Sequence, residues 1–432
     1  MKSELCEILE RAERALERGL SREEKLNALE KLRSLVDNRQ STYVRAIVEE
    51  AKKPWLLADG EVKRALTNIE EAIRFQGTSQ DKGIDMGDST GGESKEAIWR
   101  AFPRGVVLGI TPYNFPLNLV LHKVLPAICS GAPIILKPDP RTPTAAVELQ
   151  ADLDTAGLPE GFVQVLQCNV EDVEELCLDE RVEVISFTGS EKVGWYLKAK
   201  HPSKHVVLEL GGTATALYAK PEIDKKEVEE LTRAALAFSG QVCISTQNIL
   251  VSRSLLPEMQ ACFQALMREI KRGAPEAEDT LYGPVIDQRH ADGLMAQFEK
   301  AVDDGAEVWM SGEDDGLNLA ARLITLPHHR FEIAREEIFG PALVLIPYDD
   351  DQEALMIFRE IKSTLQAAVF TDDDERWDFF QARIRTGALL RNRPPTFRVD
   401  SMPYGGVKTS GVGREGVAYA FEEFSERRLI IS

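Results

Sequence analysis

The chain has 432 residues with a formal net charge of −19, and 43% of the residues are hydrophobic. A chain of this length can bury a large core and is expected to form two domains, or three. The acidic balance argues against nucleic acid or an anionic membrane as the main partner, because both need a basic surface. No apolar run reaches the length of a membrane span and no signal-peptide pattern opens the chain, so we expect a cytoplasmic protein.

The six cysteines include no C-x-x-C pair, and the six histidines are scattered along the chain. This pattern offers neither a disulfide framework nor the spacing of metal ligands. Reduced thiols and no metal are therefore expected.

The first 75 residues predict packed helices. Leucine and alanine recur at helical spacing from Leu5 to Leu20, and leucine again from Leu26 to Leu35, while residues 62–75 predict a further amphipathic helix. Ser21-Arg22-Glu23-Glu24 is typical of a capping box at a helix start. The polar, glycine-rich stretch at 76–94 leads into an apolar run at 97–102, which together predict a hairpin near 84–102 that projects from the body.

Short apolar strands alternate with helices from residue 105 onward. Strands are expected at 105–110, 133–138, 163–166, 184–187 and 206–210, and helices at 117–130, 144–156 and 170–178. Mostly apolar strands that alternate with helices predict a parallel, doubly wound sheet. A second α/β domain is expected from about residue 213, with helices to Phe238 and at 257–272, 290–304 and 351–362, and strands at 248–252, 307–309, from 338, and at 365–370. A helix at 417–424 and a strand at 428–431 close the chain.

Cys243 and Glu209 are candidates for chemistry. Cys243 lies beside Gly240 between a helix-like run and a strand-like run, a setting that suits a reactive thiol but also a buried structural cysteine. Glu209 stands in an otherwise apolar strand, where a carboxylate is costly without a role or a partner. An apolar pocket would raise its pKa toward that of a general base, and a salt-bridged structural glutamate is the alternative.

Polar residues also follow the expected strands. Asn114 could donate to an oxyanion or simply make a turn. Thr188-Gly189-Ser190 could bind a pyrophosphate or cap a helix, and Lys137 could reach a ribose or remain solvated. Residues 411–416 match G-x-G-x-x-G, but they lie in a C-terminal loop without the strand–turn–helix unit that a dinucleotide fingerprint requires.

Taken together, these stretches resemble the aldehyde dehydrogenase superfamily over nearly the whole chain. The matching stretches, in the family's order, are Gly109-Ile110-Thr111-Pro112-Tyr113-Asn114-Phe115-Pro116, Leu136-Lys137-Pro138, Phe187-Thr188-Gly189-Ser190, Glu209-Leu210-Gly211-Gly212, Gly240-Gln241-Val242-Cys243, Glu336-Glu337-Ile338-Phe339-Gly340-Pro341, and Pro403-Tyr404-Gly405-Gly406-Val407-Lys408 with Gly413-Arg414-Glu415. Residues 395–404 resemble the subgroup that oxidises lactaldehyde, semialdehydes and phosphonoacetaldehyde.

The resemblance implies an α/β fold of two doubly wound domains with a small β extension for oligomerisation. Residues 1–212 would form a Rossmann-like cofactor domain that carries the projecting hairpin, and residues 213–403 the catalytic domain. Residues 404–432 would form a C-terminal return that ends in an oligomerisation strand. A homodimer or homotetramer without nucleic-acid or membrane partners is expected.

The resemblance also assigns roles. Cys243 is the implied nucleophile, Glu209 the base that activates water, Asn114 with the backbone N–H of Cys243 the oxyanion hole, and Lys123 and Glu415 the route by which a proton leaves the base. The implied cofactor residues are Ile110, Thr111, Pro112, Tyr113, Lys137, Asp139, Pro140, Gly189, Ser190, Leu210, Gly211, Glu337 and Phe339. The implied substrate residues are Phe115, His122, Val242, Ile244, Arg398 and Tyr404, with Tyr113 as a further wall, and Arg398 and His122 are expected to favour a short polar or anionic aldehyde.

The expected reaction is oxidation of a small aldehyde to its acid through a cysteine thiohemiacetal and a thioester. Family members that acylate coenzyme A typically lack the glutamate that matches Glu209, so hydrolysis is expected and acylation is the alternative. The family's usual strand-bearing stretch before the first helix has no match in this sequence, and an inactive binding or structural member is a second alternative. NAD-preferring members often carry a glutamate where this chain has Pro140, so NAD is expected with NADP tolerated.

Overall fold

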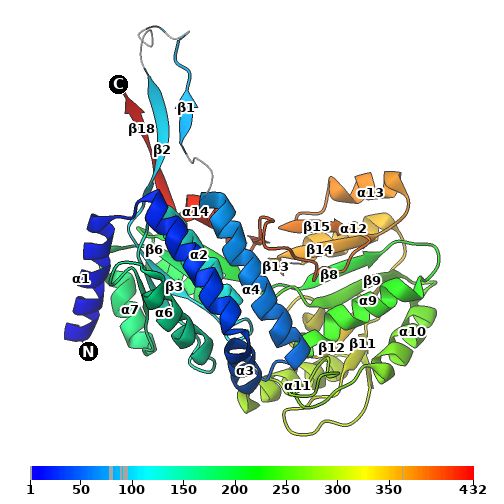
Figure 1. Ribbon diagram of the computed structural model, residues 1–432. Helices are drawn as coiled ribbons and strands as arrows, with labels where there is room; N and C mark the ends of the chain where they lie inside the picture. Colours follow the sequence, from blue (N-terminus) through cyan, green and yellow to red (C-terminus); the bar gives the residue numbers. More distant parts are fainter. Residues whose placement is uncertain (1, 77–80, 88–89, 91–95, 362) are drawn as a thin grey trace.

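The computed structural model describes residues 2–76, 81–87, 90, 96–361 and 363–432. Figure 1 shows two α/β lobes side by side, with a narrow β extension that projects from the lobe built by the first half of the chain. The two lobes are built on separate sheets, and this agrees with the predicted pair of α/β domains.

A six-stranded sheet with the order β17-β7-β6-β3-β4-β5 organises the first lobe. Its strands are β3 (Val106–Ile110), β4 (Ile134–Lys137), β5 (Val163–Val165), β6 (Val182–Gly189), β7 (His205–Leu210) and β17 (Gly411–Val412). Strands β3 to β7 are parallel, and β17 pairs antiparallel with β7. The G-x-G-x-x-G stretch therefore begins as an edge strand beside Glu209, its register partner being Gly411.

Helices cover both faces of this sheet because successive strand residues point to opposite sides. Val107 belongs to one buried cluster, whereas Val106 and Leu108 belong to the other. The helices in the cluster with Val107 are α2 (Arg22–Asn38), α3 (Gln40–Ala51), α4 (Trp55–Gln76), α5 (Asn118–Ser130), α6 (Thr144–Ala156) and α14 (Val417–Phe424), and those in the other cluster are α1 (Lys2–Arg18), α7 (Val170–Leu178) and α8 (Glu191–Lys200).

A seven-stranded sheet with the order β10-β11-β12-β9-β8-β14-β15 organises the second lobe. Its strands are β8 (Ala214–Tyr218), β9 (Thr246–Ser252), β10 (Glu307–Met310), β11 (Arg322–Thr325), β12 (Ala342–Tyr348), β14 (Gln366–Phe370) and β15 (Ala388–Arg391). All pairs are parallel except β10 with β11. One buried face includes α9 (Lys225–Leu236) and α10 (Leu256–Glu269), and the other includes α11 (Gln288–Asp303), α12 (Asp351–Glu360) and α13 (Asp374–Gln381).

The sequence predicted this lobe less completely. It missed β8, β11, β15 and α13, and it placed the strand that follows Glu337 at residue 338, whereas β12 begins at Ala342. The predicted helix to Phe238 was also wrong at its end, because α9 stops at Leu236. The following short 3-10 segment, η1 (Ala237–Gly240), has left-handed backbone angles at Phe238 and Ser239, which no α-helix can accommodate.

The projecting extension is a three-stranded sheet of β1 (Lys82–Ile84), β2 (Ala97–Pro103) and β18 (Ser425–Ile431). β1 and β2 pair antiparallel, as expected for the hairpin, although residues 88–89 and 91–95 of the predicted loop lie outside the described residues. β18 continues the sheet, so the C-terminal residues lie along the hairpin (Figure 1). Two short segments remain, the pair β13 (Ser363–Thr364) and β16 (Val407–Lys408), and η2 (Glu332–Ala334).

Candidate active site

A cavity of about 650 Å³ lies where the carboxyl ends of β3, β4, β6 and β7 meet the nucleophile loop of the second lobe. The carboxyl edge of a parallel sheet is where such folds usually bind ligands. Twelve of the thirteen residues implied for the cofactor line this cavity; Pro140 does not. Cys243, Glu209, Asn114 and Tyr404 line the same cavity, so the structure brings the candidate nucleophile, base and oxyanion donor to one place.

The loop that carries Cys243 has an unusual backbone. Phe238, Ser239 and Gly240 have φ angles of 53°, 57° and 67°, in the left-handed region. A Cβ added at Gly240 would overlap the carbonyl oxygen of Gly340, so only glycine fits there. Left-handed strain of this kind persists where the surroundings fix it, and it often marks a functional loop.

Side chains from the first lobe hold this loop in place. The Tyr113 hydroxyl donates to Gln241 Oε1 at 3.0 Å, and Asn114 Nδ2 donates to the Gln241 carbonyl oxygen at 3.0 Å. Gln241 Oε1 also accepts from the backbone N–H of Ile286 at 2.9 Å. The Asn114 amide thus contacts the backbone two residues before Cys243, and Asn114 and Cys243 line the same cavity.

Cys243 lies in a small apolar cluster with Ile244, Leu365 and Tyr404, against which Val242 also packs. Its sulfur lies 2.8 Å from the hydroxyl oxygen of Tyr404. Burial raises the pKa of the Cys243 thiol to about 11, while the hydrogen bond to Tyr404 and the positive charge of Arg398 act in the opposite direction. The thiol is therefore protonated at neutral pH unless the site favours the thiolate.

Glu209 is buried on β7, and neither carboxylate oxygen has a hydrogen-bond partner among the described residues. Burial raises its pKa well above the usual value, and the charge of Glu415 adds to this effect, while Arg398 and Lys123 oppose it. A buried carboxylate without a hydrogen-bond partner is costly, so its place beside the cavity is best explained by a ligand or by water.

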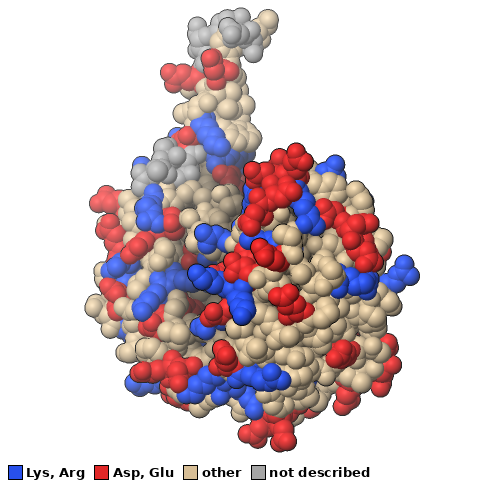
Figure 2. All heavy atoms as spheres, turned by 90° about the vertical axis from the view of Figure 1, so that its right-hand side faces the viewer, with Lys and Arg blue, Asp and Glu red and all other residues tan. Residues whose placement is uncertain are grey.

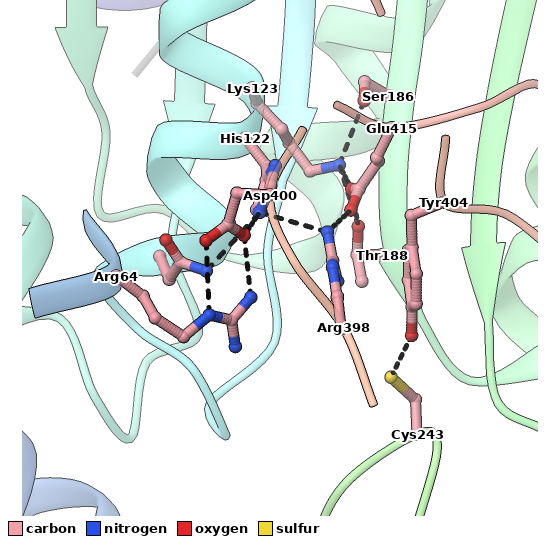
Figure 3. Close-up of polar contacts among 11 residues, drawn as sticks. Arg64, His122, Lys123, Ser186, Thr188, Cys243, Arg398, Asp400, Tyr404 and Glu415 are labelled. Carbon is pink, nitrogen blue, oxygen red and sulfur yellow. Dashed lines mark hydrogen bonds and ion pairs between the residues drawn. The ribbon is translucent and has the colours of Figure 1, made fainter. Parts of the chain in front are cut away.

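Lys123 and Glu415 lie behind the cavity rather than in its lining. Lys123 Nζ donates to Ser186 Oγ at 3.0 Å and to Thr188 Oγ1 at 2.8 Å, and it lies 3.4 Å from Glu415 Oε1 (Figure 3). Burial lowers the pKa of Lys123 despite the charges of Glu415 and Glu209. The charges of Lys123 and Glu415 both act on the pKa of Glu209.

Arg398 joins this cluster from the loop before Tyr404, as Figure 3 shows. Its guanidinium lies 3.5 Å from the centre of the Tyr404 ring, 3.0 Å from His122 Nε2 and 3.6 Å from Glu415 Oε2. Its side chain is 8% exposed, and its Nε has no hydrogen-bond partner among the described residues. Arg398 therefore has a buried donor without a partner in the described part of the chain, and the residue lies behind Tyr404 and not in the cavity lining.

His122 belongs to a chain of polar contacts that runs from Arg398 through Asp400 to Arg64. Asp400 Oδ1 lies 3.1 Å from His122 Nε2 and accepts from Arg64 Nη2 at 2.7 Å (Figure 3). Burial lowers the pKa of His122, and the charge of Arg398 lowers it further. His122 thus lies between Arg398 and Asp400 and outside the cavity lining, whereas the sequence predicted a direct contact with substrate.

Phe115 also lies away from the cavity lining. Its ring is covered by the buried ammonium group of Lys53, which lies 3.6 Å from the ring centre and is paired with Glu61. Glu61 in turn accepts from the backbone N–H groups of Leu117 and Asn118, at the start of α5. Phe115 therefore packs under α5, and the cavity wall nearest to it is formed by Tyr113 and Asn114.

The cavity also contains features that fit a dinucleotide. The Thr111 Oγ1 atom is buried without a hydrogen-bond partner among the described residues, and Ser190 precedes α8 without a side-chain cap bond. The free N–H groups of a helix start attract a pyrophosphate. The Glu337 carboxylate occupies the space that a Cβ of Gly211 would need and accepts from Gly212 N at 3.2 Å, so it reaches the cavity only because residue 211 is glycine. Burial raises the pKa of Glu337 to about 7.

The mouth near Lys137 carries an arginine between two aspartates. Arg141 pairs with Asp139 at 2.8 Å and with Asp287 of the second lobe at 2.9 Å, and its guanidinium lies 4.3 Å from the centre of the Tyr113 ring. These contacts join the two lobes across the cavity. They also pair the positive charge of Arg141 with two carboxylates.

Sequence reasoning missed several residues of this site. His290 and Leu365 line the cavity, and Arg64 and Asp400 hold the arginine cluster in place. Asp400 lies in the subgroup-like stretch, and its place two residues after Arg398 was its only signal in the sequence. Arg64 lies 336 positions away in sequence on a surface helix, where nothing distinguishes it from a solvated arginine.

Surface charge, metal-ligand groups and helix length do not contradict this interpretation of the site. Figure 2 shows acidic and basic side chains intermingled over one face, with the β extension standing clear of the body. Within residues that the structure describes, no group of three or more histidine, cysteine, aspartate or glutamate side chains is placed to hold a metal ion. None of the described helices combines the length and apolar character needed to cross a membrane.

Comparison with known proteins gives a consistent result. The aldehyde dehydrogenase family model matches residues 2–430. The chain is 33% identical to the 3-sulfolactaldehyde dehydrogenase of Priestia aryabhattai, over 100% of this chain and 90% of that protein. Two solved structures also match. Aldehyde dehydrogenase 21 of Physcomitrella patens, in complex with the reaction product succinate, has a TM-score of 0.95 and 32% identity over 100% of this chain and 91% of that one. Glyceraldehyde-3-phosphate dehydrogenase of Methanocaldococcus jannaschii, complexed with NADP, has a TM-score of 0.94 and 30% identity over 100% and 94%.

Proposed function

The chain belongs to the aldehyde dehydrogenase family, and from that membership we propose that it oxidises short aldehydes with an anionic group, with Arg398 as the residue that recognises this group. The chain is an NAD(P)-dependent oxidoreductase that converts a small aldehyde to its carboxylic acid. The most informative feature for substrate class is Arg398, a buried guanidinium whose Nε is unpaired among the described residues and which lies over the ring of Tyr404, whose hydroxyl contacts Cys243.

The relatives support an anionic substrate. Their names refer to sulfolactaldehyde, to the product succinate and to glyceraldehyde 3-phosphate, which carry a sulfonate, a carboxylate and a phosphate. A buried guanidinium is well suited to such groups because its planar donors match the oxygens of an acid. Two acidic side chains near Arg398, Glu415 and Asp400, balance its charge when no substrate is bound.

In the proposed mechanism, the Cys243 thiolate attacks the aldehyde carbon and forms a thiohemiacetal. The Asn114 amide and the backbone N–H of Cys243 stabilise the oxyanion. Bound NAD(P)⁺ supplies the hydride acceptor, at C4 of its nicotinamide. Glu337 and Lys137 would hold the ribose hydroxyls, Ser190 the pyrophosphate, and Phe339 would pack at the nicotinamide end.

Glu209 then serves the hydrolytic step. It removes a proton from water, which attacks the thioester, and the acid leaves Cys243. Burial raises the pKa of Glu209, and its carboxylate is therefore a stronger base than an exposed one. Lys123 and Glu415 would carry the proton away from the base toward Thr188 and solvent. Transfer of the acyl group to coenzyme A is the competing reaction, and the free carboxylate of Glu209 favours hydrolysis over it.

We infer the cofactor preference from the charged residues that line the cavity. Among the lining residues, Lys137 and Arg141 are basic while Asp139, Glu174, Glu209 and Glu337 are acidic. A 2′-phosphate would meet the Asp139 carboxylate, and Arg141 is already paired with Asp139 and Asp287. NAD is therefore the preferred cofactor in this proposal, with NADP used less efficiently.

The β extension is the proposed contact between subunits of a dimer or tetramer. Trp99 on β2 and Leu429, Ile430 and Ile431 on β18 are exposed, although strand residues of this kind usually become buried. We further assign residues 1–212 to cofactor binding, 213–403 to catalysis and 404–432 to the C-terminal return. A cytoplasmic location is part of the same proposal.

The substrate proposal is tested by Arg398→Ala. We expect kcat/KM for succinic semialdehyde and for an aldehyde sulfonate to fall by about a hundredfold or more, because a charge-assisted contact is lost. The value for propanal should change far less. Arg393→Ala is the matched control, since Arg393 is exposed in the same loop and stacks on Phe397. Equal losses for anionic and neutral aldehydes would contradict the role of Arg398. A wild-type chain that oxidises none of these aldehydes would instead favour an inactive family member.

A further inference from the structure

The Tyr404 hydroxyl lies closer to Cys243 Sγ than a side chain that only forms a wall of the cavity would need to lie. Its hydroxyl oxygen is 2.8 Å from Cys243 Sγ, and no other described side chain hydrogen-bonds that sulfur (Figure 3). An apolar wall would be served equally well by the ring alone. A buried hydroxyl group that points at the nucleophile must therefore be explained separately.

The backbone fixes Tyr404 in this position. Its N–H donates to the Glu415 carbonyl oxygen at 3.1 Å, and the Glu415 N–H donates to the Tyr404 carbonyl oxygen at 2.6 Å. Its ring is 3% exposed and packs with Ile244 and Leu365. The phenol therefore has little freedom to turn away from the sulfur.

Arg398 completes the arrangement from the other side of the ring. Its guanidinium lies 3.5 Å from the ring centre, close enough for a strong cation–π contact. A cation over the ring draws electron density from the phenol and makes its O–H a better donor. The same cation favours negative charge on the neighbouring sulfur.

The phenol itself stays protonated. Burial raises the pKa of Tyr404 well above its usual value, and the neighbouring Cys243 adds to the effect, so both oppose ionisation of the phenol. A hydrogen bond to a charged acceptor is stronger than one to a neutral acceptor. The contact therefore gains strength when the thiol becomes a thiolate.

We propose that Tyr404 is a catalytic residue that donates a hydrogen bond to the Cys243 thiolate, both when the thiolate forms and when it is released from the thioester. This inference rests on the proposed role of Cys243 as the nucleophile. At the start, the thiol proton passes to solvent water and the negative charge on sulfur is held by the Tyr404 O–H. The sulfur lone pair then forms the C–S bond, and the carbonyl pair moves to the aldehyde oxygen.

Tyr404 acts a second time after the thiohemiacetal has lost its hydride and become the thioester. Water adds to the acyl carbon as Glu209 takes its proton, and the C–S bond breaks with its electron pair on sulfur. This step regenerates the thiolate, which again accepts from the Tyr404 O–H. Tyr404 neither gains nor loses a proton in the cycle, so its effect is a stabilised thiolate and not acid–base transfer.

The test is the pH dependence of Cys243 alkylation in Tyr404→Phe, measured without substrate. Iodoacetamide labelling is followed by mass spectrometry of the peptide that contains Cys243, which separates this thiol from the exposed Cys6. We expect the midpoint of the alkylation profile to move up by about one pH unit or more, since a hydrogen bond to a charged group is lost. Tyr348→Phe is the control, because Tyr348 is a buried tyrosine in β12 whose hydroxyl donates to the Tyr218 carbonyl oxygen at 3.0 Å, away from the site. Its profile should match the wild type.

The same variant separates this inference from the proposed function. With an aldehyde that the wild type oxidises, Tyr404→Phe should lose about tenfold or more of its activity at neutral pH and recover part of it as the pH rises. Superimposable alkylation profiles for wild type and Tyr404→Phe would overturn the inference, even with aldehyde oxidation intact. A shifted profile in a wild type that oxidises no aldehyde would leave the inference standing and remove the proposed function. If Tyr404→Phe fails to fold, Arg398→Met tests the same coupling, with a smaller upward shift expected and an unchanged profile counting against it.

Discussion

Replacement of Glu209 by glutamine should separate the two halves of the reaction. Glutamine has nearly the same shape, and neither carboxylate oxygen of Glu209 has a hydrogen-bond partner among the described residues. The substitution therefore removes no bond, and the free energy of unfolding should change by no more than about 1 kcal/mol. The base is lost, however, and general-base catalysis typically contributes about 10²–10⁴-fold in rate.

The expected kinetic result is a burst of reduced cofactor followed by very slow turnover. Cys243 can still attack and hydride can still be transferred, so about one equivalent of reduced cofactor should form per active site. Steady-state kcat should then fall by about 10²–10⁴-fold, because the thioester waits for unactivated water. Rapid-mixing absorbance gives the burst, and intact-protein mass spectrometry detects the acyl group on the enzyme.

Glu183→Gln provides the matched control, since Glu183 is an exposed glutamate on β6 of the same sheet. It should behave as the wild type. Two results would refute the reasoning for Glu209: a variant with wild-type kcat, or one that loses the burst together with turnover while still binding the cofactor. The first would show that another group activates water, and the second that Glu209 acts at or before acylation.

Other parts of the site lead to four further predictions. Asn114→Ala should lower kcat by about 10²–10³-fold with little change in KM, since one oxyanion donor is lost; an unaltered kcat would remove Asn114 from that role. Asp139→Ala should raise the ratio of kcat/KM for NADP over NAD by about tenfold, ~1.4 kcal/mol, because it frees Arg141 and removes a repelling carboxylate; an unchanged ratio would contradict this. Gly240→Ala should destabilise the protein by about 3 kcal/mol or more in urea unfolding, since its Cβ would overlap the Gly340 carbonyl, and wild-type stability would show that the loop has another conformation. Wild-type kcat/KM should rise from pH 6 to pH 9, because burial raises the pKa of Cys243 and the thiol acts in its deprotonated form; a profile that falls over this range would be inconsistent with this role of Cys243.

The sequence predicted the first lobe better than the second. Strands such as 105–110 and 206–210 are short apolar runs next to clear helix signals, and the structure has β3 and β7 there. In the second lobe, β8 and β15 are short runs on either side of β14, and both pair with it although other elements separate them from it in the chain. The left-handed turn before Cys243 could not be predicted either, since it is imposed by packing against Gly340 and by the bonds that Gln241 makes.

The sequence also predicted one part of the site and missed another. Motif resemblance named residues that line one cavity, including Lys137, Ser190 and Glu337. It could not show that His122 lies behind Arg398, or that Arg141 is paired with two aspartates, because these contacts join segments far apart in the chain. The sequence identified Tyr404 as a substrate residue. It could not predict the contact between its hydroxyl and Cys243, because that contact joins the C-terminal return to the loop that carries Cys243.

The most direct test of the central claim is the identity of the product. The protein is incubated with an anionic aldehyde such as succinic semialdehyde and with NAD, with and without coenzyme A, and the product is identified by mass spectrometry alongside the absorbance of the reduced cofactor. We predict one molecule of free carboxylic acid for each molecule of reduced cofactor, in both incubations, and no product from Cys243→Ser. Formation of an acyl-coenzyme A thioester, or equal product from Cys243→Ser, would contradict a hydrolytic reaction carried by Cys243 and Glu209.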